Sequence, residues 1–256
     1  MVSRSNSDRL RRQRNVLLAS LLMLAAISWV VVMRQAGMTG SASATMEMTI
    51  PLFLVAWVAM MMAMMFPTAA PMIMMFAAVS AGRKLRGQPF VPTWIFVGSY
   101  LLVWIAFGLL AYGVAVGVDA LSRESMWVMN NARRVGGILL LAAGLYQLSP
   151  LKNLCLAKCR SPLSFILTSW RDGRAGALWM GLKHGAYCFG CCWLLFAILF
   201  PLGIMDIAAM IAITLLIFAE KSLPTGTLIA RLAGTALVGY GAVVIFVPDA
   251  LPGMTM

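Results

Sequence analysis

Long apolar runs dominate this sequence, and each run is bounded by charged residues, glycine or proline. Hydrophobic residues make up 62% of the chain and charged residues only 11%, whereas soluble proteins contain about half and about a quarter of these classes. The runs lack the polar–apolar alternation of outer-membrane barrel strands. In lipid, the backbone groups of a non-barrel segment are satisfied only in helices. We therefore predict an all-α, polytopic transmembrane helical bundle.

About seven spans are expected, because a helix needs about 20 residues to cross the hydrocarbon core. They comprise residues 16–33, 52–81, 93–118, 134–149, 178–202, 207–221 and 227–247. Six spans result if the short sixth segment is re-entrant. Pro67 and Pro71 should kink or break the second span, since each removes a backbone donor. The expected organisation is a basic N-terminal segment (1–15), one transmembrane domain (16–248) and a C-terminal tail (249–256).

The net charge of +12 is concentrated on alternate loops. Basic residues precede the first run and follow the second and the fourth: Arg4, Arg9, Arg11, Arg12, Arg14, Arg83, Lys84, Arg86, Lys152, Lys158, Arg160, Arg171 and Arg174. Cytoplasmic loops carry this excess under the positive-inside rule, so the charge indicates topology rather than nucleic-acid binding. We expect a bacterial inner (cytoplasmic) membrane protein with a cytoplasmic N-terminus, whose basic faces suit anionic lipid.

Methionines cluster in the second expected span. Helical spacing places several of them on one face: Met61, Met64, Met65, Met72 and Met75. Thioethers are soft ligands that favour Cu(I), and the pairs Met60–Met64 and Met61–Met65 could share a metal across one helical turn. The alternative is packing, because methionine is also a flexible apolar core residue.

The fifth expected span contains the only histidine and three cysteines. His184, Cys188 and Cys191 have the spacing i, i+4, i+7, and Cys192 follows directly. Imidazole and thiolate on one helical stripe suit Cu(I), zinc or an iron centre. Buried free thiols and a packing surface around Gly181-x-x-x-Gly185 are the alternatives. The C-x-x-C spacing also leaves a thiol–disulfide role open.

Two more cysteines, Cys155 and Cys159, fall in an expected cytoplasmic connection over residues 150–175. We expect them to form a docking point for metal, ~15–20 Å from the cysteines of the fifth span at ~1.5 Å per helical residue. Two sites in series are then more natural than one shared site. Packing is the alternative role for this pair.

Charged residues also lie within the apolar segments. Lys183 and Glu220 fall at the same face of the expected bundle, and an intramembrane charge is costly unless it is paired or solvated. We predict a Lys183–Glu220 ion pair, with snorkelling of each side chain to the interface as the alternative. Lys221 is expected to snorkel.

Several segments together resemble a known family. They are Trp57-Val58-Ala59-Met60-Met61-Met62-Ala63-Met64-Met65 with Pro67 and Pro71, Tyr146-Gln147-Leu148-Ser149-Pro150-Leu151-Lys152 with Cys155, Cys159, Arg160 and Pro162, then Gly190-Cys191-Cys192-Trp193 and Glu220-Lys221. They are similar to those of a bacterial family of uncharacterised, predicted metal-binding integral membrane proteins. The resemblance covers residues 50–225. It implies a polytopic fold and a metal role for methionine and cysteine, and it implies no activity.

The leading hypothesis is a membrane protein that binds, transfers or transports copper as Cu(I). Its partners would be the lipid bilayer and either other membrane subunits or a metal chaperone. One alternative is a non-catalytic subunit of a larger membrane oxidoreductase or monooxygenase complex, and another is a membrane enzyme with a redox centre. The chain has no nucleotide-binding P-loop, no Ser–His–Asp set and no c-type haem motif, which favours the absence of catalysis by this chain alone.

Overall fold

The computed structural model describes residues 2–38, 49–88, 91–204 and 206–251, and these parts consist of helices joined by short turns, with no strand among them. The predicted C-terminal tail therefore lies mostly outside the described residues. The elements are α1 (Val2–Met38), α2 (Ile50–Leu85), α3 (Thr93–Glu124), α4 (Met126–Leu148), α5 (Pro150–Arg160), α6 (Pro162–Ser169), α7 (Gly173–Ala197), α8 (Leu199–Leu202), α9 (Ile207–Ser222), α10 (Gly226–Phe246) and a 3-10 turn, η1 (Pro248–Ala250). The prediction of an all-α bundle is confirmed.

Five helical stretches in the described part are long and apolar enough to cross a membrane. A sixth is obtained if α4 and α5, which meet at an angle of 63°, are counted as one broken span. Helix α9 has only 16 residues, about 24 Å at ~1.5 Å per residue, and is shorter than the ~30 Å hydrocarbon core. By length and composition, the described residues thus contain five or six candidate spans, which agrees with the expected alternative of six rather than with seven.

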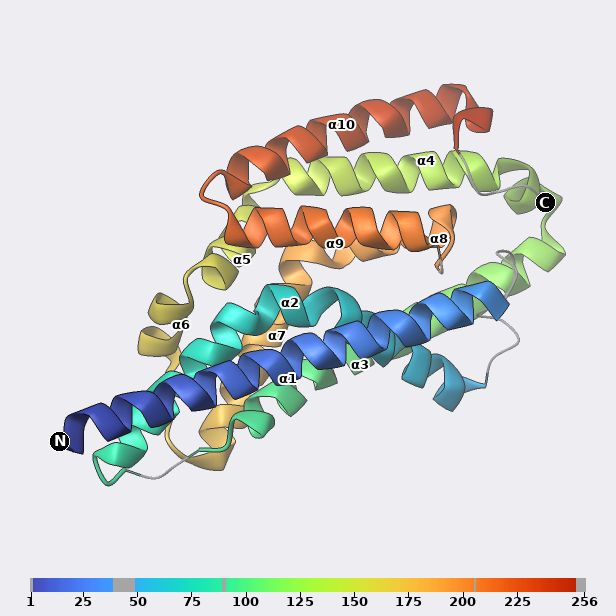
Figure 1. The fold of residues 1–256 in the computed structure, drawn as a ribbon. Helices are drawn as coiled ribbons and strands as arrows, with labels where there is room; N and C mark the ends of the chain where they lie inside the picture. Colours follow the sequence, from blue (N-terminus) through green and yellow to red (C-terminus); the bar gives the residue numbers. More distant parts are fainter. Residues whose placement is uncertain (1, 39–48, 89–90, 205, 252–256) are drawn as a thin grey trace.

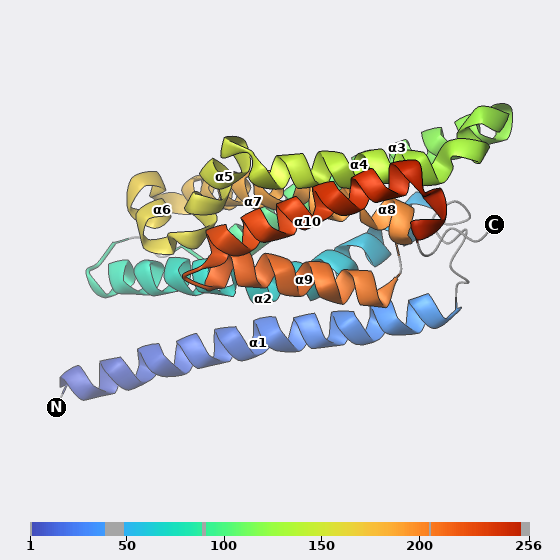
Figure 2. The same ribbon diagram turned by 90° about the horizontal axis from the view of Figure 1, so that it is seen from above.

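The long helices α1, α4, α9 and α10 run in roughly the same direction, while α5 and α6 lie obliquely at one end of the bundle (Figure 1). Helix α1 lies along α2 on one side of the molecule, as Figure 2 shows, while α4 packs against α10 on another. Helix α7 packs chiefly against α3 and α5. More than half of its most apolar stretch is buried, so side chains on α7 lie in the interior of the bundle.

Glycines bring α3 and α7 into close contact. A Cβ added at Gly181 would overlap the side chain of Ser99, and one added at Gly185 would lie 2.7 Å from Val103. The predicted role of Gly181-x-x-x-Gly185 as a packing surface is thus confirmed. Because the next turn of α7 carries Cys188, this contact also places Tyr100 of α3 beside that cysteine.

Helix α2 continues through Pro67 and Pro71 without interruption. The expected break is therefore absent, and the kink stays a prediction. Trp57 fixes α2 to α3, because its indole Nε1 donates to the carbonyl oxygen of Trp104 at 2.9 Å.

The segment after α4 is a helix packed against the bundle rather than a loop. Ser149 caps the start of α5 by accepting a hydrogen bond from the backbone N–H of Lys152, and Pro150 occupies the first turn, where a missing N–H costs nothing. Helix α5 then packs against α7 and α9.

An ion pair in the interior holds α5 to α9. Lys152 Nζ lies 2.7 Å from Glu220 Oε2, and the two side chains are 0% and 2% exposed. Gln147 of α4 donates to the other carboxylate oxygen at 2.7 Å. At the end of α5, the Arg160 guanidinium donates to the carbonyl oxygens of Leu223 and Pro224. Helices α4, α5 and α9 therefore meet at one buried carboxylate.

The predicted Lys183–Glu220 ion pair was wrong. Lys183 Nζ donates to Ser169 Oγ at 3.0 Å, while Glu220 is paired with Lys152. The prediction failed because residues 150–160 were assigned to a cytoplasmic loop, which left Lys152 out of the interior.

Loss of one partner of this pair should destabilise the protein far more than loss of both. Lys152→Met leaves a buried carboxylate without its cation and should lower the free energy of unfolding by about 3–5 kcal/mol. The double variant Lys152→Met/Glu220→Met should recover most of that loss. Unfolding of the purified protein in mild detergent, followed by tryptophan fluorescence, measures both. Additive losses in the double variant would contradict the pairing.

Candidate metal centre

Four cysteines from two helices form what we call the thiol cluster: Cys159 of α5 with Cys188, Cys191 and Cys192 of α7. The spacing i, i+3, i+4 places the three cysteines of α7 on one helical face, and their side chains are at most 1% exposed. The Cys159 side chain lies close enough to those of Cys188 and Cys191 to interact with them. All four are free thiols.

The predicted separation of two cysteine sites was therefore wrong for Cys159. The expectation of ~15–20 Å assumed that the chain leaves the membrane after α4. Helix α5 instead bends by 63° from α4 and stays packed against α7. One shared site, rather than two in series, contains Cys159 and the cysteines of α7.

Cys188 is the sulfur that faces a cation and a phenol. Lys221 Nζ of α9 donates to Cys188 Sγ at 3.1 Å, and Tyr100 Oη lies 3.3 Å from the same sulfur. An ammonium and a hydroxyl both stabilise a negative charge on sulfur. Of the four cysteines, Cys188 is thus the one best placed to be a thiolate.

Cys191 and Cys192 use their thiols differently. Their sulfurs lie 3.1 and 2.8 Å from the Cys188 carbonyl oxygen, to which they donate along the helix. A thiol that donates is protonated, so a metal bound at either sulfur must displace its proton. The cluster therefore combines one sulfur prepared as a thiolate with two that are held as thiols.

Lys221 does not snorkel to the interface as expected. Glu220 and Lys221 are consecutive on α9, and consecutive helical residues point about 100° apart. Glu220 is directed at Lys152 and Gln147, so Lys221 is directed at the thiol cluster. The contacts of Glu220 thus fix the orientation of α9, and this orientation places the ammonium of Lys221 beside the thiol cluster.

Cys155 lies one turn before Cys159 on the outer side of the cluster. It is partly exposed, and its sulfur would be only 2.8 Å from a Cβ added at Gly190. The Tyr146 hydroxyl donates to the carbonyl oxygen of Gly190. Gly190 thus leaves room for Cys155 to approach α7 beside Cys191.

His184 lies on α7 one turn before Cys188, in an aromatic cage. Its ring stacks on Phe96 and Tyr100, with centroid separations of 5.9 and 5.5 Å, and meets the edge of Phe165. Neither ring nitrogen has a hydrogen-bond partner, so neither reaches a sulfur in this arrangement. The predicted stripe of His184, Cys188 and Cys191 is present, but neither imidazole nitrogen contacts a sulfur.

The predicted methionine ligands Met61, Met64 and Met65 are completely buried in the core. Helix α2 packs mainly against α1, α3, α6 and α9, whereas the thiol cluster lies among α5, α7 and α9. A ligand role for these methionines stays a prediction. Helix α9, which contacts both α2 and α7, connects the two regions.

Three residues of the site were missed from the sequence: Lys152, Tyr100 and Lys221. Lys152, Cys155 and Cys159 have the spacing i, i+3, i+7 and lie on one face of α5. The two cysteines on this stripe indicate a face that packs inside, because free cysteine is among the most buried residue types, whereas the lysine gives no such signal. Tyr100 carried no comparable signal, because its role depends on how α3 and α7 pack.

The donor chemistry of the cluster suits a soft metal. Thiolates favour Cu(I), zinc and iron–sulfur clusters over hard cations. Within the described residues, no group of three His, Cys, Asp or Glu side chains is arranged to hold a metal ion as it stands. Binding therefore requires the thiols that donate to the Cys188 carbonyl to turn toward the metal.

A family model described as a copper chaperone, PpoB2, matches residues 54–244. No curated protein and no solved structure matches the chain. The matched range contains all five cysteines and the methionines of α2.

The proximity of Cys159 to α7 can be tested by cross-linking. A variant that keeps only Cys159 and Cys191, with serine at the other three positions, should form an intramolecular disulfide rapidly with diamide. A control that keeps only Cys155 and Cys188 should react more slowly, since Cys155 faces Gly190. Peptide mass spectrometry reads both. Equal rates would contradict the observed placement of α5.

Proposed function

Because this chain belongs to the PpoB2 copper chaperone family, we propose that it is an integral membrane protein that binds Cu(I) at the thiol cluster and transfers it to another carrier. The proposal rests mainly on one observation: Cys159 of α5 lies beside Cys188 and Cys191 of α7, and Lys221 donates to Cys188. The family supports a role with copper, and the cluster supplies soft ligands of the kind that select Cu(I).

The outer surface of the bundle supports the membrane location. Large apolar side chains are exposed on most of the long helices, among them Leu24, Val55, Leu110, Ile138, Leu232 and Phe246. Soluble monomers rarely expose contiguous apolar surface on this scale, whereas lipid covers it at no cost. The proposed location is the bacterial cytoplasmic membrane, with the N-terminus in the cytoplasm, on the basis of the positive-inside pattern.

Charge balance favours a monovalent metal. Two thiolates and one Cu(I) carry a net charge of −1, which the ammonium of Lys221 neutralises. A divalent ion on the same two thiolates would leave the lysine charge uncompensated in a buried site, and an unpaired buried charge is costly. We assign Cys188 as the first thiolate and Cys159 or Cys191 as the second.

The arrangement of sulfurs also suits transfer. Cys155 is partly exposed one turn outside the cluster, whereas Cys188 is completely buried. Copper would exchange between thiolates in steps, entering or leaving through Cys155 and Cys159. His184, with its unpartnered nitrogens, and the α2 methionines remain candidate additional ligands.

Loss of cluster sulfurs should abolish tight copper binding. Cys188→Ser and Cys159→Ser should each weaken Cu(I) binding by about tenfold or more, about 1.4 kcal/mol per factor of ten. Cys155→Ser should change the affinity by less than about threefold while slowing transfer. Competition of the purified protein in detergent with a chromophoric Cu(I) chelator measures affinity and rate. Wild-type protein that takes up no Cu(I) under reducing conditions would refute the proposal.

Substitution of Lys221 tests whether its ammonium balances the charge of the copper site. Lys221→Gln should weaken Cu(I) binding by about tenfold, the usual scale for loss of an outer-shell partner of a metal site, and Lys221→Arg should restore most of it. Lys183→Gln is the matched control, because this lysine contacts Ser169 rather than a sulfur. The same chelator competition applies. Equal effects at positions 183 and 221 would show that Lys221 does not balance the site.

A further inference from the structure

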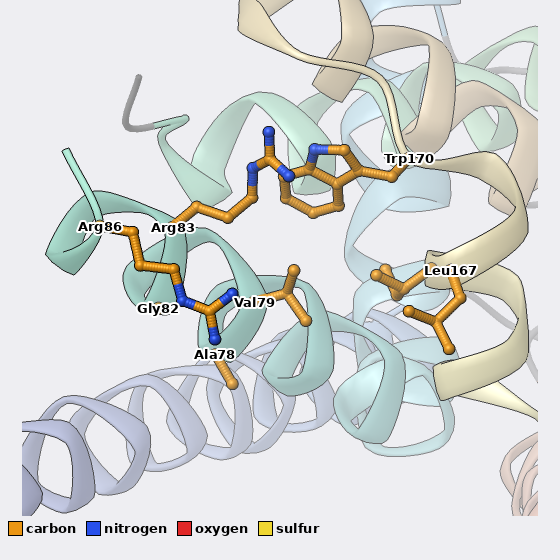
Figure 3. A pocket seen from close by; sticks show the side chains of 8 residues that line it. Ala78, Val79, Gly82, Arg83, Arg86, Leu167 and Trp170 are labelled. Carbon is orange, nitrogen blue, oxygen red and sulfur yellow. The ribbon is translucent and has the colours of Figure 1, made fainter. Parts of the chain in front are cut away.

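A pocket of about 590 Å³ lies between the end of α2 and the segment from α6 to Trp170. It is lined by Ala78, Val79, Gly82, Arg83, Arg86, Ile166, Leu167 and Trp170 (Figure 3). None of these residues belongs to the thiol cluster. Its volume is within the range of small-molecule sites.

One side of the pocket is apolar and the other is cationic. Val79, Ile166 and Leu167 supply aliphatic surface, and Figure 3 shows Leu167 across the pocket from the last turns of α2. Arg83 and Arg86 supply two guanidinium groups. A ligand that fits must therefore combine a hydrocarbon part with a negatively charged group.

Arg83 and Arg86 differ in their ion-pair and hydrogen-bond partners. Arg83 pairs with Asp172 and lies over the ring of Trp170, 5.1 Å from its centroid, but its buried Nε has no acceptor. Arg86 is exposed and makes no ion pair among the residues that the structure describes. One unpaired positive charge and one unsatisfied N–H thus remain at the rim.

We propose that this pocket binds an anionic phospholipid. Its phosphate would be held by the Arg86 guanidinium and the Arg83 Nε–H, since guanidinium groups match phosphate oxygens in geometry and charge. One acyl chain would lie along Val79, Ile166 and Leu167. The inference rests on the membrane location in the proposed function and is independent of copper. It also fits the position of the pocket at a basic end of the bundle, where anionic headgroups gather.

The bound lipid would have a structural consequence for the thiol cluster. The pocket joins α2 to α6, and α6 follows directly after α5, which carries Cys155 and Cys159. A lipid bridging α2 and α6 would hold this part of the chain against the bundle.

Native mass spectrometry of the full-length protein in detergent tests the proposal. Added phosphatidylglycerol should give a one-to-one adduct, and phosphatidylcholine should bind about tenfold more weakly. Arg86→Gln should weaken the phosphatidylglycerol adduct by about tenfold. Lys84→Gln is the matched control, because it removes the same charge from the same turn without lining the pocket. Leu167→Glu should also weaken the adduct, by opposing the acyl chain.

Three results would overturn the inference. Equal binding of the two lipids would exclude recognition of the anionic headgroup, and an unchanged adduct in Arg86→Gln would exclude this pocket. Displacement of the lipid by millimolar inorganic phosphate would show that the site takes phosphate alone. Copper binding measured on the same samples separates the two proposals, because Arg86→Gln should bind Cu(I) as the wild type does. Protein that stays soluble without detergent would instead refute the membrane location itself.

Discussion

The buried carboxylate of Glu220 organises the region on which the candidate function depends. It accepts hydrogen bonds from Lys152 on α5 and from Gln147 on α4, so three helices converge on one side chain. A charge in the interior is tolerated only when it is paired, and this requirement holds α5 inside the bundle. Because Cys159 lies two turns along α5 from Lys152, the same ion pair places that cysteine against α7.

Lys221, the residue after Glu220, acts on the chemistry of the thiol cluster. With the carboxylate of Glu220 already neutralised, the charge of Lys221 is free to act on sulfur, and it lies 3.1 Å from Cys188. Tyr100, brought close by the glycine contact between α3 and α7, adds a second donor. The cluster thus obtains a thiolate in an apolar interior without an uncompensated charge, which is the condition that a buried soft-metal site must satisfy.

The class of fold could be predicted from composition and run length because these are local properties, and the spacing of Cys188, Cys191 and Cys192 on one helical face followed from the same periodicity. The position of Cys159 could not be predicted in this way. Residues 150–160 are polar enough to be taken for a loop, and only the partner supplied by Glu220, about 70 residues later, makes their burial favourable. Tyr100 and Lys221 depend likewise on packing between distant helices, and the short α9 shows why the count of spans was less certain than the class.

The cluster sulfurs differ in how readily they lose a proton, and this difference bears on how the metal would be bound and released. Lys221 and Tyr100 would stabilise a thiolate at Cys188, whereas the thiols of Cys191 and Cys192 donate to a carbonyl oxygen. A second sulfur therefore joins the metal only by losing a proton, so tight binding needs a proton acceptor nearby or a route for the proton outward. The imidazole of His184 lies one turn away, but it is enclosed by aromatic rings without a counter-ion, so a further positive charge there would be costly. The proton of the second thiol would therefore leave the cluster as Cu(I) binds, and return of a proton to that sulfur would favour release of the metal to an acceptor thiol.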